Sequence, residues 1–143
     1  MGSPFHYVVI RTFCYATEDE QKVKKAFSFI SNCEEEKIDR RKVEGYFGDE
    51  IKIFEMMIKN SSSIKKLCKH IFTAISSEDI KKNVSNDCSL ILKFSKQDAF
   101  EEKMTLTHGN DIIFLKGKIK AYPSSKENAI KTLLDAKREY RKN

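Results

Sequence analysis

The sequence predicts an α+β fold with two layers, in which helices pack mostly on one face of a largely antiparallel sheet. Two observations predict it. Segments with strand character and segments with helical periodicity both occur, but they do not alternate strictly enough for a doubly wound sheet. The 143 residues are 40% hydrophobic with ten Phe, enough to build one core without disulfides. We therefore expect a single domain over residues 1–143, with residues 1–4 disordered or left from an expression vector.

The first predicted elements are a strand and a helix. Residues 5–15, FHYVVIRTFCY, are β-branched and aromatic on both faces, which favours a central place in a sheet. Thr17, followed by Glu20 three residues later, matches a capping box and predicts the start of a helix. The helical spacing of four apolar residues gives this helix one buried face: Val23, Ala26, Phe27 and Ile30.

The middle of the chain predicts a charged loop, a hairpin and two helices. CEEEKIDRRK is the loop, and VEGYFGDEIKIFEMMI is the hairpin, which turns at Gly48 and Asp49, a pair suited to positive φ. A second helix begins at Asn60 or Ser61, and a short third helix spans Glu78 to Val84. The second helix has one apolar stripe: Ile64, Leu67, Cys68, Ile71, Phe72 and Ile75.

The last third predicts a strand, a second hairpin and a final helix. CSLILKF is the strand, and the hairpin joins 103–107 to 112–122 through a turn at HGND. The final helix starts at a capping box over Ser124 to Glu127. Apolar residues repeat along one side of each element. The strand buries Leu90, Leu92 and Phe94, and the helix buries Ile130, Leu133 and Leu134.

A lysine repeat in the last strand is the main candidate binding feature. Lys116, Lys118 and Lys120 share one face with Phe114 and Tyr122. Alternate strand residues lie about 6.6–6.8 Å apart, comparable to the step between phosphates of a nucleic-acid backbone. Each ammonium group could displace a counterion and the aromatic rings could stack on bases. The competing interpretation is the solvated face of an ordinary sheet.

The charge distribution favours an anionic partner. Residues 112–143 carry nine Lys and Arg against three Asp and Glu, whereas residues 1–111 carry 18 of each sign. The predicted second helix adds a basic cluster, Lys65, Lys66 and Lys69, on the side away from its apolar stripe. The competing interpretation of this cluster is again an exposed, lysine-rich helix face without a binding role. An uneven charge of this kind is typical of polyanion binding.

Enzyme and membrane functions find little support. The three His have no metal-ligand spacing, and neither a phosphate loop nor a G-x-S-x-G motif occurs, so we expect no enzyme, cofactor or metal. A nuclease with dispersed acidic metal ligands stays a third option. The four Cys lack close spacing and are interpreted as reduced core residues. Without a long apolar segment, we expect a cytoplasmic protein with no membrane partner.

Three segments together resemble a known family. VEGYFGDEI, LILKFSKQDAF and KGKIKAYP are similar to an archaeal RNA-binding family, a predicted exosome-associated component whose fold resembles the ribosomal protein that holds 5S rRNA. The resemblance implies RNA as the partner, with the exosome or other RNA-processing proteins beside it. It matches the hairpin glycines to Gly45 and Gly48 and the signature pair to Lys96 and Gln97. At Lys93 the family tends to have Arg, so a bidentate phosphate contact is lost.

The function hypothesis is a non-catalytic RNA-binding protein that recognises backbone and shape. Its expected contacts are Lys116, Lys118, Lys120, Tyr122, Lys96, Lys93, Lys65, Lys66 and Lys69. The alternative is a protein-interaction or assembly module, a homodimer or adaptor without direct RNA binding. It would use Tyr46 and Phe47 at the first hairpin together with an uncovered sheet edge.

Overall fold

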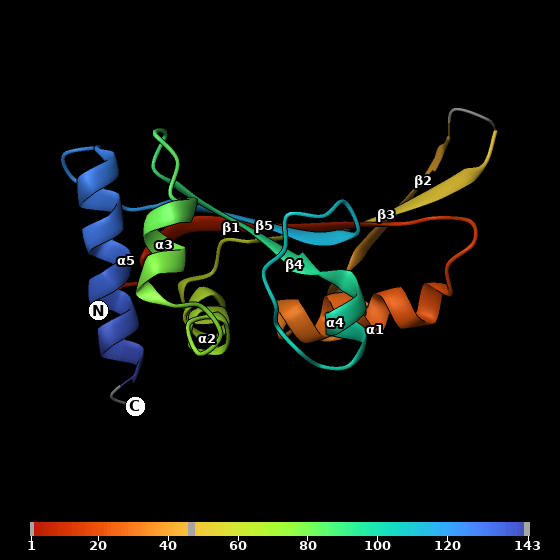
Figure 1. Cartoon of the computed structure of the whole chain (residues 1–143), viewed down its shortest axis with the longest axis horizontal. Coiled ribbons are helices and arrows are strands. Elements are labelled where there is room, and N and C mark those ends of the chain that lie inside the picture. The colour runs from red at the N-terminus through yellow and green to blue at the C-terminus, as the bar shows by residue number, and fades with distance from the viewer. Residues whose placement is uncertain (1, 46–47, 142–143) are drawn as a thin grey trace. The chain divides into compact units, whose positions relative to one another are not determined.

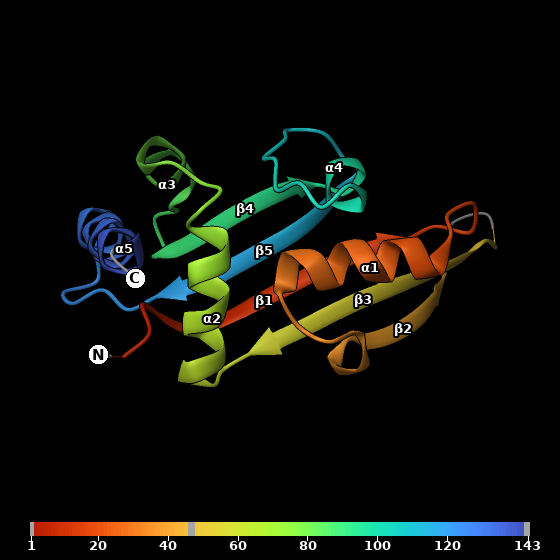
Figure 2. The same cartoon turned by 90° about the horizontal axis from the view of Figure 1, so that it is seen from below.

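The computed structural model describes residues 2–45 and 48–141. Its strands form one open sheet in the order β2-β3-β1-β5-β4, and neighbouring strands run in opposite directions (Figure 1, Figure 2). The predicted α+β class with an antiparallel sheet is confirmed. The strands are β1 (Phe5–Cys14), β2 (Asp39–Glu44), β3 (Glu50–Ile58), β4 (Ser89–Ser95) and β5 (Ile112–Ile119).

The chain forms two compact units through which the strands pass. Unit 1 comprises 1–9, 57–92 and 115–143, and unit 2 comprises 10–56 and 93–114. Neither unit is continuous in the sequence, because β1, β3, β4 and β5 each contribute to both. A single domain over the whole chain stays a prediction.

In unit 2, two helices cover one face of the strands. α1 (Glu20–Ser31) packs against α4 (Lys96–Phe100), and both lie on the same side of the strands (Figure 1). The predicted buried side of α1 is confirmed. Its cap is Asp19, whose carboxylate accepts hydrogen bonds from the amides of the first turn. Thr17 cannot cap α1 because it lies in a turn closed by the Glu18 amide and the Tyr15 carbonyl.

Two other predictions for unit 2 need correction. The charged loop contains a short 3-10 helix, η1 (Glu35–Lys37), and β2 already begins at Asp39, so the basic run is part of a strand. Residues 103–107, all described, form no strand; within them Leu106 makes an isolated bridge to Phe94. The segment instead meets the end of β4, where the Ser95 amide donates to the Thr105 carbonyl at 2.7 Å, and β5 pairs with β1 and β4.

The first hairpin is confirmed as the pairing of β2 with β3. Gly48 has a φ of 82°, a conformation that is strained for residues with a side chain. The Gly45 amide donates to the Asp49 carbonyl at 2.5 Å. Tyr46 and Phe47 lie outside the described residues, so their proposed interaction role is not placed.

In unit 1, three helices pack beside the strands. α5 (Lys126–Arg141) contacts both α2 (Ser61–Ile71) and α3 (Ser77–Asn83), and Figure 1 shows α3 beside α5. Asn60 caps α2 as predicted. The start of α5 differs, because the hydroxyl of Ser125, not Ser124, accepts from the first turn at 3.1 Å. The apolar stripe predicted for the second helix is buried at every position.

One glycine permits a close approach in the core of unit 1. A Cβ at Gly117 would lie 2.6 Å from the Phe5 ring, closer than real contacts allow. The absence of a side chain at this position of β5 therefore lets the ring lie directly on the strand. None of the four cysteines, all of which are described, forms a disulfide, and within the described part of the chain no helix is long and apolar enough to cross a membrane.

Candidate functional site

The two units differ strongly in charge. Unit 1 contains 15 Lys and Arg against six Asp and Glu, whereas unit 2 contains 12 against 15. The excess of positive charge in residues 112–143 is therefore part of a larger basic unit, which also includes the lysines of α2. Unit 1 is the part of the molecule suited to a polyanion.

The lysines of β5 lie on the face opposite the core. Burial alternates along the strand, with Leu115, Gly117 and Ile119 buried and the lysines between them half-buried. Lys116 Nζ is 3.9 Å from Asp87 Oδ2, and Lys118 Nζ donates a hydrogen bond to the Asp87 backbone carbonyl. The tertiary structure thus brings one acid to a segment that contains none in sequence.

Asp87 is held in its ionised form. A hydrogen bond from the Ser85 hydroxyl, followed by the charges of Lys116 and Lys118, lowers the pKa of its carboxyl group. One carboxylate shared by two ammonium groups leaves net positive charge on this face. No sequence pattern indicates this neighbour, because Asp87 lies in the turn before β4.

The far end of the lysine repeat is open. Lys120 follows β5 and is exposed, while its backbone is held by the Pro4 carbonyl at 2.9 Å and by the Thr132 hydroxyl at 3.3 Å. Tyr122 is 99% exposed, so its whole ring is accessible. Side chains held on an ordered backbone but free at the tip are suited to contact a ligand.

The lysines of α2 line a cleft against α5, called here the α2–α5 cleft. It has a volume of about 620 Å³. Within residues 2–45 and 48–141, none of its three ammonium groups forms an ion pair. The lining residues are Gly2, Ser61, Ser62, Lys65, Lys66, Lys69, Glu139 and Tyr140.

A second, smaller cavity in unit 1 is lined in part by Lys120 and adjoins the α2–α5 cleft. Its volume is about 320 Å³, and Lys120, Thr132 and Asp135 belong to its walls. Gly2, Glu139 and Tyr140 line both this cavity and the α2–α5 cleft. The end of the lysine repeat and the α2 lysines are therefore neighbours, although they are far apart in the sequence.

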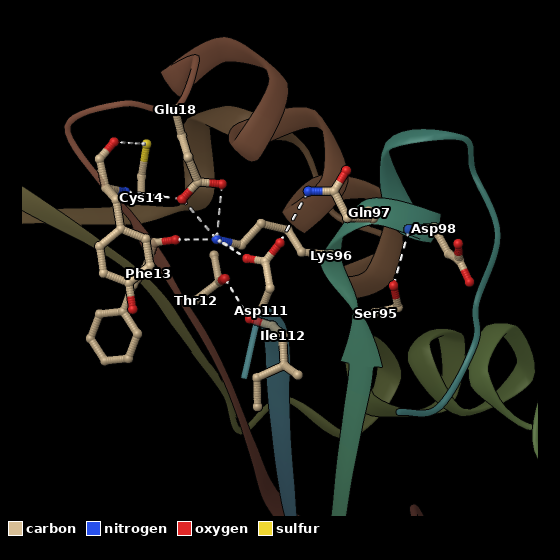
Figure 3. A network of polar contacts seen from close by, with 11 residues as sticks. Thr12, Phe13, Cys14, Glu18, Ser95, Lys96, Gln97, Asp98, Asp111 and Ile112 are labelled. Carbon is tan, nitrogen blue, oxygen red and sulfur yellow. Dashed lines mark hydrogen bonds and ion pairs between the residues drawn. The ribbon is translucent and has the colours of Figure 1, made fainter. Parts of the chain in front are cut away.

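Lys96, a predicted RNA contact, is a buried structural residue of unit 2. Its side chain is 1% exposed, and Figure 3 shows its ammonium group at the centre of a polar network. Nζ donates to the Phe13 carbonyl at 2.6 Å and lies 3.0 Å from carboxylate oxygens of both Glu18 and Asp111. These three partners join the end of β1, the approach to α1 and the start of β5.

The network extends to the second residue of the signature pair. Gln97 Nε2 donates to Asp111 Oδ2 at 3.1 Å (Figure 3). Burial raises the pKa of Asp111, but the hydrogen bonds from Gln97 and Lys96 and the charge of Lys96 outweigh it and lower the pKa overall. A lysine with these partners cannot reach a phosphate without breaking them, so the predicted contact of Lys96 with RNA stays a prediction that would cost these interactions.

Unit 2 contains the predicted contact Lys93 and also exposes apolar side chains that the sequence did not indicate. Lys93 is exposed on β4. Phe13 and Tyr15, 41% and 45% exposed, have ring centroids 6.4 Å apart, and Val43 on the edge strand β2 is also exposed. Period-two alternation in FHYVVIRTFCY could have signalled Phe13, but both faces of that segment are apolar.

The part of the chain that the structure describes shows no metal-binding site. There, no group of three or more His, Cys, Asp or Glu side chains is placed to hold a metal ion. The acidic residues Glu18 to Glu20 lie before and at the start of α1, and Glu34 to Glu36 lie before and within η1.

Comparison with known proteins gives consistent matches over most of the chain. A family model described as RNA binding matches residues 7–119. The RNA-binding protein PAB1135 of Pyrococcus abyssi is 32% identical over 142 residues, covering 90% of each chain. The uncharacterized protein MJ0213 of Methanocaldococcus jannaschii is 34% identical over 140 residues, covering 89% of this chain and 93% of that protein.

Solved structures share the fold. A DUF54 protein from Methanothermobacter thermautotrophicus superimposes with a TM-score of 0.80 at 23% identity, covering 92% of this chain and 97% of that one. A protein from Archaeglobus fulgidus gives a TM-score of 0.77 at 25% identity, covering 92% and 99%.

Proposed function

This chain belongs to the RNA binding family, and from that premise we propose that it is a non-catalytic RNA-binding protein whose contacts lie in unit 1. The observation that carries the proposal is the charge of that unit, 15 Lys and Arg against six Asp and Glu. Lysines that neutralise phosphates release counterions, which supplies affinity without reading sequence. The protein therefore recognises backbone and shape.

The primary contact is the lysine repeat. Lys116 and Lys118 lie on one side of β5, at a spacing that suits successive phosphates, and Lys120 follows the end of the strand. Asp87 offsets part of this charge. Tyr122 lies just beyond, and its exposed ring can stack on an unpaired base.

The other predicted residues fall into three groups. Lys65, Lys66 and Lys69 form a second contact in unit 1, in the α2–α5 cleft. Lys93 is a weaker candidate, since it belongs to the net acidic unit 2. Lys96 is the least favoured candidate, because its ammonium group already has three partners.

The test compares RNA affinity for two charge-matched variants by fluorescence anisotropy over a range of salt. One variant changes Lys116, Lys118 and Lys120 to Glu, and the control changes three exposed unit 1 lysines, Lys59, Lys82 and Lys131, to Glu. We expect the first variant to weaken binding at least about tenfold more than the control. The slope of log affinity against log salt should fall by about 0.7 per lost contact to a single strand.

Equal losses in the two variants would refute the lysine repeat as the contact, because bulk charge would then explain the binding. A separate change, Tyr122→Ala, should weaken binding of single-stranded RNA by about 1–3 kcal/mol. It should leave thermal stability unchanged, since the ring is 99% exposed. Unchanged affinity for single-stranded RNA would show that the ring does not stack on a base.

A second candidate function is an assembly module, favoured by the exposed apolar pair Phe13 and Tyr15 and by the edge position of β2. The partner would be a second copy, or the exosome or other RNA-processing proteins that the family resemblance implies. Light scattering of the wild type and of Phe13→Ser/Tyr15→Ser tests it. A monomeric wild type, with no partner lost from pull-downs by the variant, would reject it.

A further inference from the structure

The α2–α5 cleft has the size of a single nucleotide. Its volume of about 620 Å³ lies within the range of about 300–1,000 Å³ that is typical of small-ligand sites. Residues of α2 line one side of the cleft and the last residues of α5 line the other. The cleft therefore raises the question of which part of an RNA it takes.

The charge of the cleft matches a terminal phosphate better than an internal one. Lys65, Lys66 and Lys69 contribute three positive charges and Glu139 one negative charge, for a net of +2. A phosphate monoester carries about −1.5 to −2 at neutral pH, since its second pKa is about 6. An internal phosphodiester carries only −1. Ser61 and Ser62 add hydroxyl donors to the same wall.

The opposite wall is suited to a ribose. The Glu139 carboxylate can accept hydrogen bonds from sugar hydroxyls but would repel a second phosphate beside it. The Tyr140 ring packs on Phe72 with centroids 6.0 Å apart, which gives the wall a fixed apolar surface. Burial raises the pKa of Tyr140 to about 12, so its hydroxyl remains a hydrogen-bond donor at neutral pH.

The cleft adjoins the proposed track for the RNA backbone. Lys120 lines the neighbouring cavity, which shares Gly2, Glu139 and Tyr140 with the α2–α5 cleft. Lys120, the last lysine of the repeat, therefore lies next to the cleft.

From these four observations we propose that the α2–α5 cleft binds the phosphorylated terminal nucleotide of RNA. The proposal rests on the proposed RNA-binding function and adds an end preference to it. Lys65, Lys66 and Lys69 hold the terminal phosphate, and Glu139 accepts from the ribose. The protein would then distinguish RNA ends with a phosphate from ends with a hydroxyl.

The experiment uses one single-stranded RNA sequence in three forms, with a 5′-phosphate, with a 3′-phosphate, or with hydroxyls at both ends. Each carries the same internal fluorophore, and affinities are measured by anisotropy at pH 7.5 and pH 5. We expect one phosphorylated form to bind about tenfold more tightly than the hydroxyl form. The two phosphorylated forms identify the end. The preference should shrink at pH 5, where the monoester loses its second charge.

Two variants locate the effect. Lys65→Ala/Lys66→Ala/Lys69→Ala should abolish the preference, whereas a control with the same charge loss, in which Lys59, Lys82 and Lys131 become Ala, should keep it. Retention of the preference in the cleft variant, or its loss in both variants, would refute the proposal. If the cleft variant does not fold, the wild-type comparison of the three RNA forms decides alone.

The outcomes separate the end preference from RNA binding itself. Equal affinity of the wild type for all three forms refutes the terminal-phosphate site and leaves the proposed function standing. A failure of all three forms to bind refutes both. The Glu variant of the β5 lysines should weaken all three forms together, since it removes backbone contacts rather than the end contact.

Discussion

Replacing Lys96 by Met tests whether this signature residue has a structural role or contacts RNA. Methionine keeps much of the aliphatic volume and removes the ammonium group. The change leaves the carboxylates of Glu18 and Asp111 without their shared cation and the Phe13 carbonyl without its donor. Because these partners come from the end of β1, the approach to α1 and the start of β5, we expect unit 2 to lose stability.

The size of the expected loss in stability follows from how deeply Lys96 and its two carboxylate partners are buried. Removing one partner of a buried ion pair typically costs about 3–5 kcal/mol, because the other charge is left uncompensated. Here the side chains of Glu18 and Asp111 are 19% and 45% exposed, so water can partly replace the lysine. The orphaned carbonyl adds to the cost. We expect the free energy of unfolding to fall by about 2–4 kcal/mol.

Urea denaturation followed by circular dichroism measures the change, and a slope of about 2 kcal/mol/M converts it to a midpoint shift of about 1–2 M. Lys93→Met is the control, since it removes an exposed lysine three residues earlier and should change stability by less than about 0.5 kcal/mol. Glu18→Gln combined with Lys96→Met should cost less than the sum of the two single changes.

RNA affinity completes the test of Lys96. The folded Lys96→Met variant should bind RNA as the wild type does, because the buried ammonium group does not face a ligand. An unchanged midpoint together with weaker RNA binding would refute the reasoning. It would show that Lys96 leaves its network to contact phosphate.

Two further predictions concern stability. Gly117→Ala places a Cβ 2.6 Å from the Phe5 ring and should cost about 1–3 kcal/mol in thermal unfolding, whereas Gly109→Ala meets no atom closer than 3.5 Å and should be nearly neutral; equal effects would refute the close approach. A hydrogen bond from Arg40 is the main reason that the pKa of Glu20 falls from 4.5 to about 2. Above about pH 4.5 the ionised carboxylate stabilises the fold. This stabilisation is lost as pH falls toward 2 and the carboxylate is protonated. The stability gap between wild type and Glu20→Gln should narrow over that window, and a constant gap would contradict it.

Periodic patterns in the sequence predicted the elements that bury one side. The α2 stripe from Ile64 to Ile71 and the alternation along β5 both arise from local geometry, 3.6 residues per helical turn and two per strand repeat. These patterns were sufficient for the α+β class and for the lysine face of β5. They depend only on near neighbours in the chain.

Short motifs were less reliable, because alternative local hydrogen bonds compete. The two capping boxes were predicted too early in the sequence. The first-turn amides donate instead to Asp19, two residues after Thr17, and to Ser125, one residue after Ser124. The predicted second hairpin is wrong because residues 103–107 meet the end of β4 through one bridge, Phe94–Leu106, whereas β5 pairs with β1 and β4. A cap is decided by which side chain reaches the free amides, and that geometry is set by the turn before it.

The sequence by itself determined the class of fold, the face of β5 that carries lysines and the excess of positive charge. Only the tertiary structure decided which charges have partners. It buried Lys96 between two carboxylates, brought Asp87 to the β5 lysines, and placed Lys120 beside the cleft of Lys65. Electrostatic interactions act over a few ångströms in space regardless of separation along the chain, so residues far apart in sequence determine what each lysine can bind.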